Sequence, residues 1–79
     1  MIYLNTKLKK SFTNSKGEVF YEGDCFQTLQ TDYYYRVDEI NFDTGKVTYT
    51  GFNIRHGNST EYIINLTELV SLDIYKYIP

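Results

Sequence analysis

Three groups of turn-forming residues divide the chain into segments rich in β-branched and aromatic residues. They are Asn14–Gly17, Asp43–Gly45 and His56–Ser59. Each group supplies Asn or Asp to begin a turn, Gly to adopt a positive φ angle, or both. The only proline is Pro79, so the residues before it keep their backbone N–H groups for a β-ladder. This pattern predicts an all-β fold with one short helical turn. It fits either a small barrel or a strongly bent antiparallel meander of about five to six strands.

The expected strands are 6–13, 18–30 with a break near Gly23, 33–42, 46–54, 61–64 and 73–78. A single helical turn is expected at 65–71, because Leu66, Leu69 and Val70 form an apolar stripe at helical spacing. Asn65 and Glu68 have the spacing of a capping box, so we expect both side chains to cap this turn.

Side-chain alternation assigns the residues of segment 33–42 to two faces. Tyr33, Tyr35 and Val37 share one face, and Tyr34, Arg36 and Asp38 share the other. After Val37 the hydrophobic phase changes, since Ile40 falls on the second face. A second change of phase occurs at Gly51, where we expect a bulge or a bend. Two phase changes in one hairpin indicate a strongly coiled sheet.

Aromatic residues exceed what so short a chain can enclose. Nine Tyr and five Phe occur among 79 residues, which form one domain, 1–79. Tyr is enriched at protein interfaces, and Arg beside an exposed Tyr is typical of an interface anchor. The sequence therefore predicts a non-enzymatic protein-interaction module that binds or inhibits a partner protein. The predicted partner-binding residues are Tyr33, Tyr34, Tyr35, Arg36, Tyr49, Asp38 and Glu39.

Charge is unevenly distributed along the chain. Residues 1–16 contain four Lys and no acid, whereas residues 17–45 contain seven acids and one Arg. The first segment supports an alternative function, nucleic-acid binding by Lys7, Lys9 and Lys10 with Tyr rings as stacking platforms. The second supports a variant of the main hypothesis, in which clustered carboxylates occupy the basic groove of a nucleic-acid-processing protein. That variant requires Asp32, Asp38, Glu39 and Asp43 to lie along one face.

Self-association is a further alternative. A chain of this kind can form a homodimer or a structural assembly through an edge strand, such as the one expected at 73–78.

The net charge of −2 argues against a dedicated nucleic-acid binder.

No set of residues with catalytic or metal-binding spacing is evident. Cys25 and His56 are the only Cys and His, too few for a zinc site, and neither has an orienting partner in the sequence. We therefore expect no enzyme activity, metal or cofactor. A single Cys excludes an internal disulfide and indicates a reducing cytoplasm. The apolar start Met1–Leu4 is too short for a signal peptide, and no run approaches the roughly 20 residues of a membrane span.

One short stretch resembles a known family. Ser15–Asp24 reads S-K-G-E-V-F-Y-E-G-D and is similar to the opening of phage YopX-type domains, although Tyr21 is an additional residue. The resemblance covers about ten residues, most of which are turn residues. It implies an SH3-like barrel of phage or mobile-element origin with a poorly defined function. From a phage-encoded chain we expect binding to a host or phage protein, for example a host defence or nucleic-acid-processing protein. It assigns no functional residues.

Overall fold

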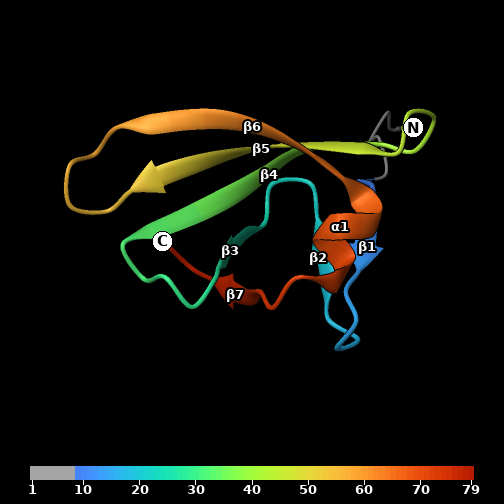
Figure 1. Cartoon of the computed structure of the whole chain (residues 1–79), viewed down its shortest axis with the longest axis horizontal. Helices are drawn as coiled ribbons and strands as arrows, with labels where there is room; N and C mark the ends of the chain where they lie inside the picture. Colours follow the sequence, from blue (N-terminus) through green and yellow to red (C-terminus); the bar gives the residue numbers. More distant parts are fainter. Residues whose placement is uncertain (1–8) are drawn as a thin grey trace, which may run out of the picture.

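The computed structural model describes residues 9–79, which form seven β-strands and one short α-helix (Figure 1). In chain order the elements are β1 (Ser11–Thr13), β2 (Val19–Tyr21), β3 (Cys25–Gln27), β4 (Tyr33–Asn41), β5 (Lys46–Asn53), β6 (Ser59–Asn65), α1 (Leu66–Ser71) and β7 (Tyr75–Tyr77). The predicted mostly-β fold with one helical turn is confirmed. The structure has one more strand than expected because the segment 18–30 divides at Gly23, which has a φ of 95°. Residues 6–8 of the first expected strand lie outside the described residues.

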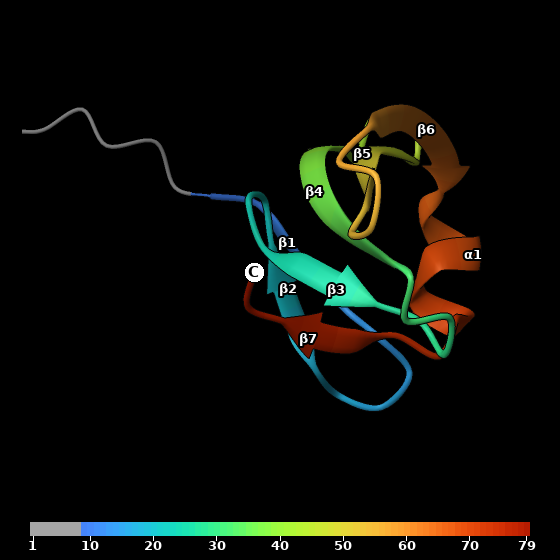
Figure 2. The same ribbon diagram turned by 90° about the vertical axis from the view of Figure 1, so that its left-hand side faces the viewer.

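Five of the strands form one antiparallel sheet in the order β6-β5-β4-β3-β7. β3 to β6 follow one another as a meander, and β7 returns to pair with β3. Figure 2 shows that this sheet bends strongly, so that α1 lies between its two ends. β6 and β7 are the two edges and do not pair with each other, so the sheet is open. The strongly bent meander is therefore the correct alternative, and the closed barrel is not formed.

The remaining two strands form a small hairpin, β1–β2, that makes a second layer together with α1 (Figure 1). Its turn is organised by Asn14, whose Oδ1 accepts hydrogen bonds from the backbone N–H groups of Lys16 and Glu18. Ser15 in the same turn donates its N–H to the carbonyl of Val70 at 2.9 Å, which ties the hairpin to α1.

The core lies between this second layer and the sheet. Its buried residues are Phe12, Phe20, Phe26, Val37, Ile40, Val47, Leu69 and Ile74. They come from nearly every part of the chain, so the hairpin, the helix and the sheet share one interior. The predicted apolar stripe of α1 is confirmed, because Leu69 is buried while Leu66 and Val70 pack against the core.

β4 contains the predicted change of phase. The register between β4 and β5 shifts between Val37 and Glu39, so Asp38 forms a bulge and both Val37 and Ile40 are buried. The predicted bulge at Gly51 is wrong, because Gly51 pairs regularly with Tyr35 and with Thr60.

Two side chains form hydrogen bonds with the edge of β4 at the point where β3 no longer pairs with it. The N–H of Ile40 donates to the Glu22 carboxylate at 2.9 Å, and the carbonyl of Ile40 accepts from Lys10 Nζ at 3.0 Å. Glu22 and Lys10 are themselves joined, since the Glu22 N–H donates to the Lys10 carbonyl. These bonds satisfy backbone groups that a neighbouring strand would otherwise pair.

The predicted capping box at α1 is wrong. Asn65 occupies the N-cap position but makes no side-chain capping bond. Its Oδ1 instead accepts from Lys46 Nζ at 2.8 Å. The Leu66 N–H donates to the carbonyl of Gly45 at 2.8 Å, so the β4–β5 turn satisfies part of the helix start.

Candidate functional site

The main sheet has two unlike faces. Val37, Ile40 and Val47 point toward the β1–β2 hairpin and α1, and we call this side the inner face. The opposite side carries Tyr34 and Arg36, and we call it the outer face. None of the other described elements contributes a core residue to the outer face. The second layer of the described structure therefore does not cover the outer face.

Three aromatic rings stack across one end of the outer face. Tyr34 on β4 lies between Phe52 on β5 and Tyr77 on β7, and both ring centroids are 4.9 Å from that of Tyr34. The interplanar angles are 19° and 24°, so the three rings are close to parallel. All three side chains are half-buried. We call this set, Tyr77–Tyr34–Phe52, the outer aromatic row.

Arg36 borders the outer aromatic row and is held in place by two neighbours. Its guanidinium lies 5.3 Å from the centroid of Phe52, within cation–π range. Its Nε donates to Asp38 Oδ1 at 2.7 Å, and this hydrogen bond raises the pKa of Arg36. The other oxygen of Asp38 accepts from the buried hydroxyl of Thr50 at 2.5 Å. Arg36 is thus exposed and orientated at the same time.

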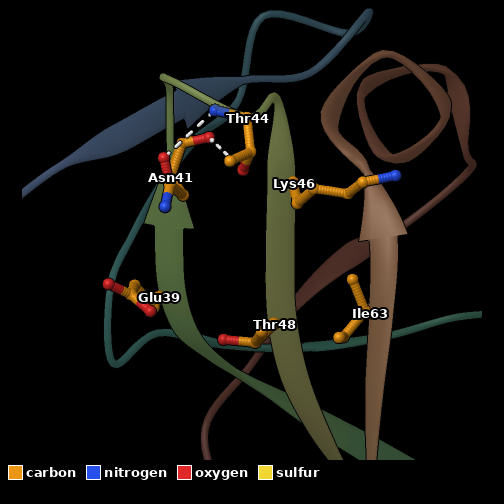
Figure 3. Close-up of a pocket in the computed structure, with 6 residues that line it drawn as sticks. All are labelled: Glu39, Asn41, Thr44, Lys46, Thr48 and Ile63. Carbon is orange, nitrogen blue, oxygen red and sulfur yellow. Dashed lines mark hydrogen bonds between the residues drawn. The ribbon is translucent and has the colours of Figure 1, made fainter.

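The other end of the outer face is hollowed (Figure 3). The hollow has a volume of about 300 Å³ and is lined by Glu39, Asn41, Thr44, Lys46, Thr48 and Ile63. Glu39 and Lys46 provide opposite charges on its two sides, and Ile63 provides an apolar wall (Figure 3). A hollow of this size is at the lower limit of small-ligand sites and fits a partner's side chain better.

The remaining predicted tyrosines belong to the inner face. Tyr35 stacks on buried Phe26 at 5.3 Å, and Tyr49 stacks on Tyr62 at 5.2 Å. Tyr33 extends the cluster, 6.4 Å from Tyr35. Burial raises the pKa of both Tyr35 and Tyr49, and the neighbouring phenols add to the effect. These rings widen the core at its open end, and none of the eight described tyrosines is fully buried.

The predicted partner-binding set is therefore divided between two surfaces. Tyr34, Arg36, Asp38 and Glu39 lie on the outer face, whereas Tyr33, Tyr35 and Tyr49 lie on the inner face. Sequence reasoning missed Phe52 and Tyr77. Phe52 was detectable in principle, because the Asp43–Gly45 turn sets the hairpin register that places it opposite Tyr34. Tyr77 was not, since β7 reaches this end of the sheet through a non-local pairing with β3.

The four carboxylates of the acidic variant do not converge. Asp32 precedes β4 and Asp43 follows it, so they lie at opposite ends of a nine-residue strand. Asp38 is engaged with Arg36 and Thr50. Asp38 and Glu39 share the outer face, and the charge of Asp38 is paired with Arg36, so the acidic variant stays a prediction.

The lysines of the nucleic-acid alternative are described only in part. Lys7 lies outside the described residues. Lys9 and Lys10 precede β1 rather than belonging to it, and Lys10 bonds to the carbonyl of Ile40. That ammonium therefore has a structural contact within the chain.

Cys25 and His56 occupy different parts of the sheet. Cys25 on β3 pairs with Arg36 and Tyr77, and burial raises the pKa of its thiol despite the opposing charge of Arg36. His56 is exposed in the turn after β5, where its backbone N–H donates to Asn53 Oδ1. Burial thus disfavours the thiolate, which is the nucleophilic form of a cysteine.

Comparisons with known proteins gave no relatives: no family model, no curated protein and no solved structure matches this chain. Within residues 9–79 no helix is long and apolar enough to cross a bilayer. The same residues contain no group of three or more His, Cys, Asp or Glu side chains that could hold a metal ion.

Proposed function

We propose that this chain is a non-enzymatic protein-interaction module that binds its partner through the outer face. The observation that carries the proposal is the outer aromatic row with Arg36 beside it, on a sheet face that the second layer does not cover. Aromatic rings and Arg are the residues most enriched at the centres of protein interfaces. Here they are pre-orientated by stacking and by Asp38, so binding requires little further loss of side-chain freedom.

The hollow at the other end of the face indicates the chemistry of the partner. Its walls combine the exposed Glu39 carboxylate with the apolar side chain of Ile63. Lys46 also lines the hollow, but its ammonium donates to Asn65 Oδ1, so the carboxylate of Glu39 is the charge we expect a partner to meet. A Lys or Arg side chain of the partner has the matching form, an apolar stem with a cationic end. A protein segment that places an apolar residue on the aromatic row and a basic residue in the hollow would use the whole face.

The geometry gives less support to nucleic-acid binding. Tyr34 stacks on Phe52 and on Tyr77, so both of its ring faces are already in contact with another ring. A base needs a free ring face for stacking. The hydroxyl groups of Tyr34 and Tyr77 can in addition form hydrogen bonds with a protein surface.

The test compares two matched double variants. Tyr34→Ala/Arg36→Ala removes the centre of the outer face, and Tyr21→Ala/Arg55→Ala removes an exposed Tyr and an exposed Arg that lie elsewhere. The partner is captured from a lysate of the source cells with the immobilised wild-type chain and is then purified. Its affinity for each folded variant is measured by calorimetry.

We expect the first double variant to bind at least tenfold more weakly and the control to bind within about twofold of wild type. Equal affinities of the two double variants, with circular dichroism showing both folded, would remove the outer face as the binding site. A labelled oligonucleotide that the wild-type chain shifts at low salt, with a shift that weakens steeply as salt is added, would instead favour the nucleic-acid alternative.

A further inference from the structure

The two edges of the main sheet are protected to very different degrees. β7 is only three residues long, its Lys76 pairs with Asp24 at 3.3 Å, and Pro79 follows two residues after its end. A short strand, a Lys and a Pro are the devices that keep an edge from pairing with another chain. β6 has none of them: it is seven residues long and contains no Lys, Arg or Pro.

β6 is also highly exposed. Six of its seven residues are exposed, although its sequence is that of an interior strand, with Tyr62, Ile63 and Ile64 in succession. Ile63 and Tyr62 are 69% and 40% exposed, and their side chains point to opposite faces of the sheet. Both faces at this edge therefore offer apolar surface to a neighbouring strand. In both views β6 forms the upper rim of the sheet (Figures 1 and 2).

The hydrogen bonds at the two ends of β6 determine which of its residues direct their backbone N–H and C=O groups to β5 and which direct them to the free edge. The Asn53 N–H donates to Asn58, and the Leu66 N–H donates to Gly45, so both of these pairs are hydrogen-bonded. In an antiparallel ladder such pairs alternate with non-bonded ones. Thr60, Tyr62 and Ile64 therefore bond to β5, whereas Ser59, Glu61 and Ile63 direct their N–H and C=O groups to the free edge. No other described strand pairs with that edge.

We propose that β6 pairs antiparallel with β6 of a second copy of this chain, around a twofold axis at Tyr62. This register uses the whole strand, because Tyr62 is its midpoint. It places Glu61 opposite Ile63 of the second copy, and both have backbone groups that face outward. The two Tyr62 residues form the central non-hydrogen-bonded pair, in which side chains approach most closely. The result is a continuous ten-stranded sheet with an outer aromatic row on each half.

Charge also favours this register. Glu61 is the only charged residue of β6. A twofold axis at Glu61 would place the two carboxylates directly opposite each other, which is destabilising. The axis at Tyr62 moves them to diagonal positions. One strand edge buries less than a standard interface of about 1,600 Å², so we expect a weak dimer, with a dissociation constant above about 1 µM.

The first test uses the outward N–H of Ile63. Ile63→Pro removes this N–H without removing a bond to β5, and Pro is tolerated at such a position of an edge strand. The matched control, Ile63→Thr, loses apolar surface but keeps the N–H. Sedimentation equilibrium up to about 1 mM should show a dimer for wild type, a dissociation constant raised at least tenfold for Ile63→Pro, and a smaller increase for Ile63→Thr. A wild-type chain that stays monomeric at 1 mM overturns the proposal, and so does a dimer that Ile63→Pro leaves unchanged.

The second test determines the register of the β6–β6 pairing by disulfide cross-linking. It uses a Cys25→Ser background, so that the introduced cysteine is the only thiol of each chain. Tyr62→Cys places two thiols at the axis, where the β-carbons of a non-bonded pair come within disulfide reach. Glu61→Cys places them diagonally, about 7 Å apart. Mild oxidation should link the first variant at least tenfold faster than the second. Equal rates, or faster linkage of the Glu61→Cys variant, overturn the twofold axis at Tyr62.

A measurement on the wild-type chain covers the case in which a variant does not fold. Amide exchange at Glu61 and Ile63 should slow as concentration rises, while exchange in β7 should not change. Concentration-independent exchange at both positions overturns the proposal. Tyr34→Ala/Arg36→Ala should leave dimerisation unchanged, so failure of the β6 interface and failure of the outer-face function are distinguishable.

Discussion

Gly51 shows how the absence of one side chain shapes the inner face. A β-carbon at this position would lie 2.9 Å from Cε1 of Tyr35 and 3.0 Å from Cε2 of Tyr62. Both distances are shorter than normal van der Waals contacts, and Gly51 is buried. Its φ angle is not positive, so Gly is needed here for space and not for backbone conformation. The two rings pack over the backbone of β5 because no side chain stands between them.

Gly51→Ala is therefore expected to lower the free energy of unfolding by about 1–3 kcal/mol, because the tyrosine rings must move to admit the methyl group. Urea denaturation followed by tyrosine fluorescence measures this change. In a Tyr62→Ala background the same substitution should cost less, since one of the two obstructing rings is gone. An equal cost in both backgrounds would contradict the steric explanation.

At the scale of elements, β4 organises the molecule. Along its first half it pairs with β3 on one side and β5 on the other. Beyond the bulge at Asp38 the chain of β3 has turned away at Gly23, and Glu22 and Lys10 bond to Ile40 in its place. The side chains of Glu22 and Lys10, which flank the β1–β2 hairpin, thereby fix it to the backbone of β4. The buried rings of Phe12 and Phe20 also hold the hairpin against the sheet.

Glu22→Ala should lower the free energy of unfolding by about 1–3 kcal/mol, because it leaves the part-buried N–H of Ile40 without an acceptor. Glu22→Gln keeps a side-chain carbonyl and should recover most of the loss. Glu68→Ala, an exposed acid on α1, is the control and should change stability by less than about 0.5 kcal/mol. Chemical denaturation measures all three, and equal effects of the Ala and Gln variants would exclude the hydrogen bond as the cause.

At the scale of the whole molecule, Asp24 joins segments far apart in sequence. Its Oδ2 accepts from the N–H of Tyr21 at 2.9 Å and from Lys76 Nζ at 3.3 Å, 52 residues away. Partial burial opposes ionisation of Asp24, but these two donors outweigh it and lower the pKa of the carboxyl below its ordinary value of 3.8. The ionised carboxylate thus helps to hold β7 against the turn between β2 and β3.

A lowered pKa in the folded state gives stability that is present above the ordinary pKa and is lost as pH falls through the folded value. Asp24→Asn should therefore be less stable than wild type at pH 5–7, by under about 1 kcal/mol because the ion pair is partly exposed. The difference should shrink below pH 3.8. Thermal unfolding of both proteins from pH 2 to pH 7 tests this, with Asp43→Asn in the β4–β5 turn as the control. A difference that stays constant down to pH 2 would contradict the assignment.

The sequence by itself determined the local features of this protein. The Asn14–Gly17 and Asp43–Gly45 turns, the break at Gly23, the phase change after Val37 and the apolar stripe of α1 all follow from residues near one another in the chain. Each depends on backbone preference or on side-chain alternation, which act over a few residues. Alternation alone also assigned Tyr34 and Arg36 to the face opposite Tyr33 and Tyr35.

Tertiary structure alone decided how these parts combine. The sheet stays open because β7 returns to pair with β3 and not with β6, and this pairing also brings Tyr77 to Tyr34. Asn65 bonds to Lys46 and not to the helix because the β4–β5 turn reaches the start of α1. Contacts between distant segments decide which face of the sheet is covered and which edge stays free. The free energy of such contacts cannot be read from a local sequence pattern.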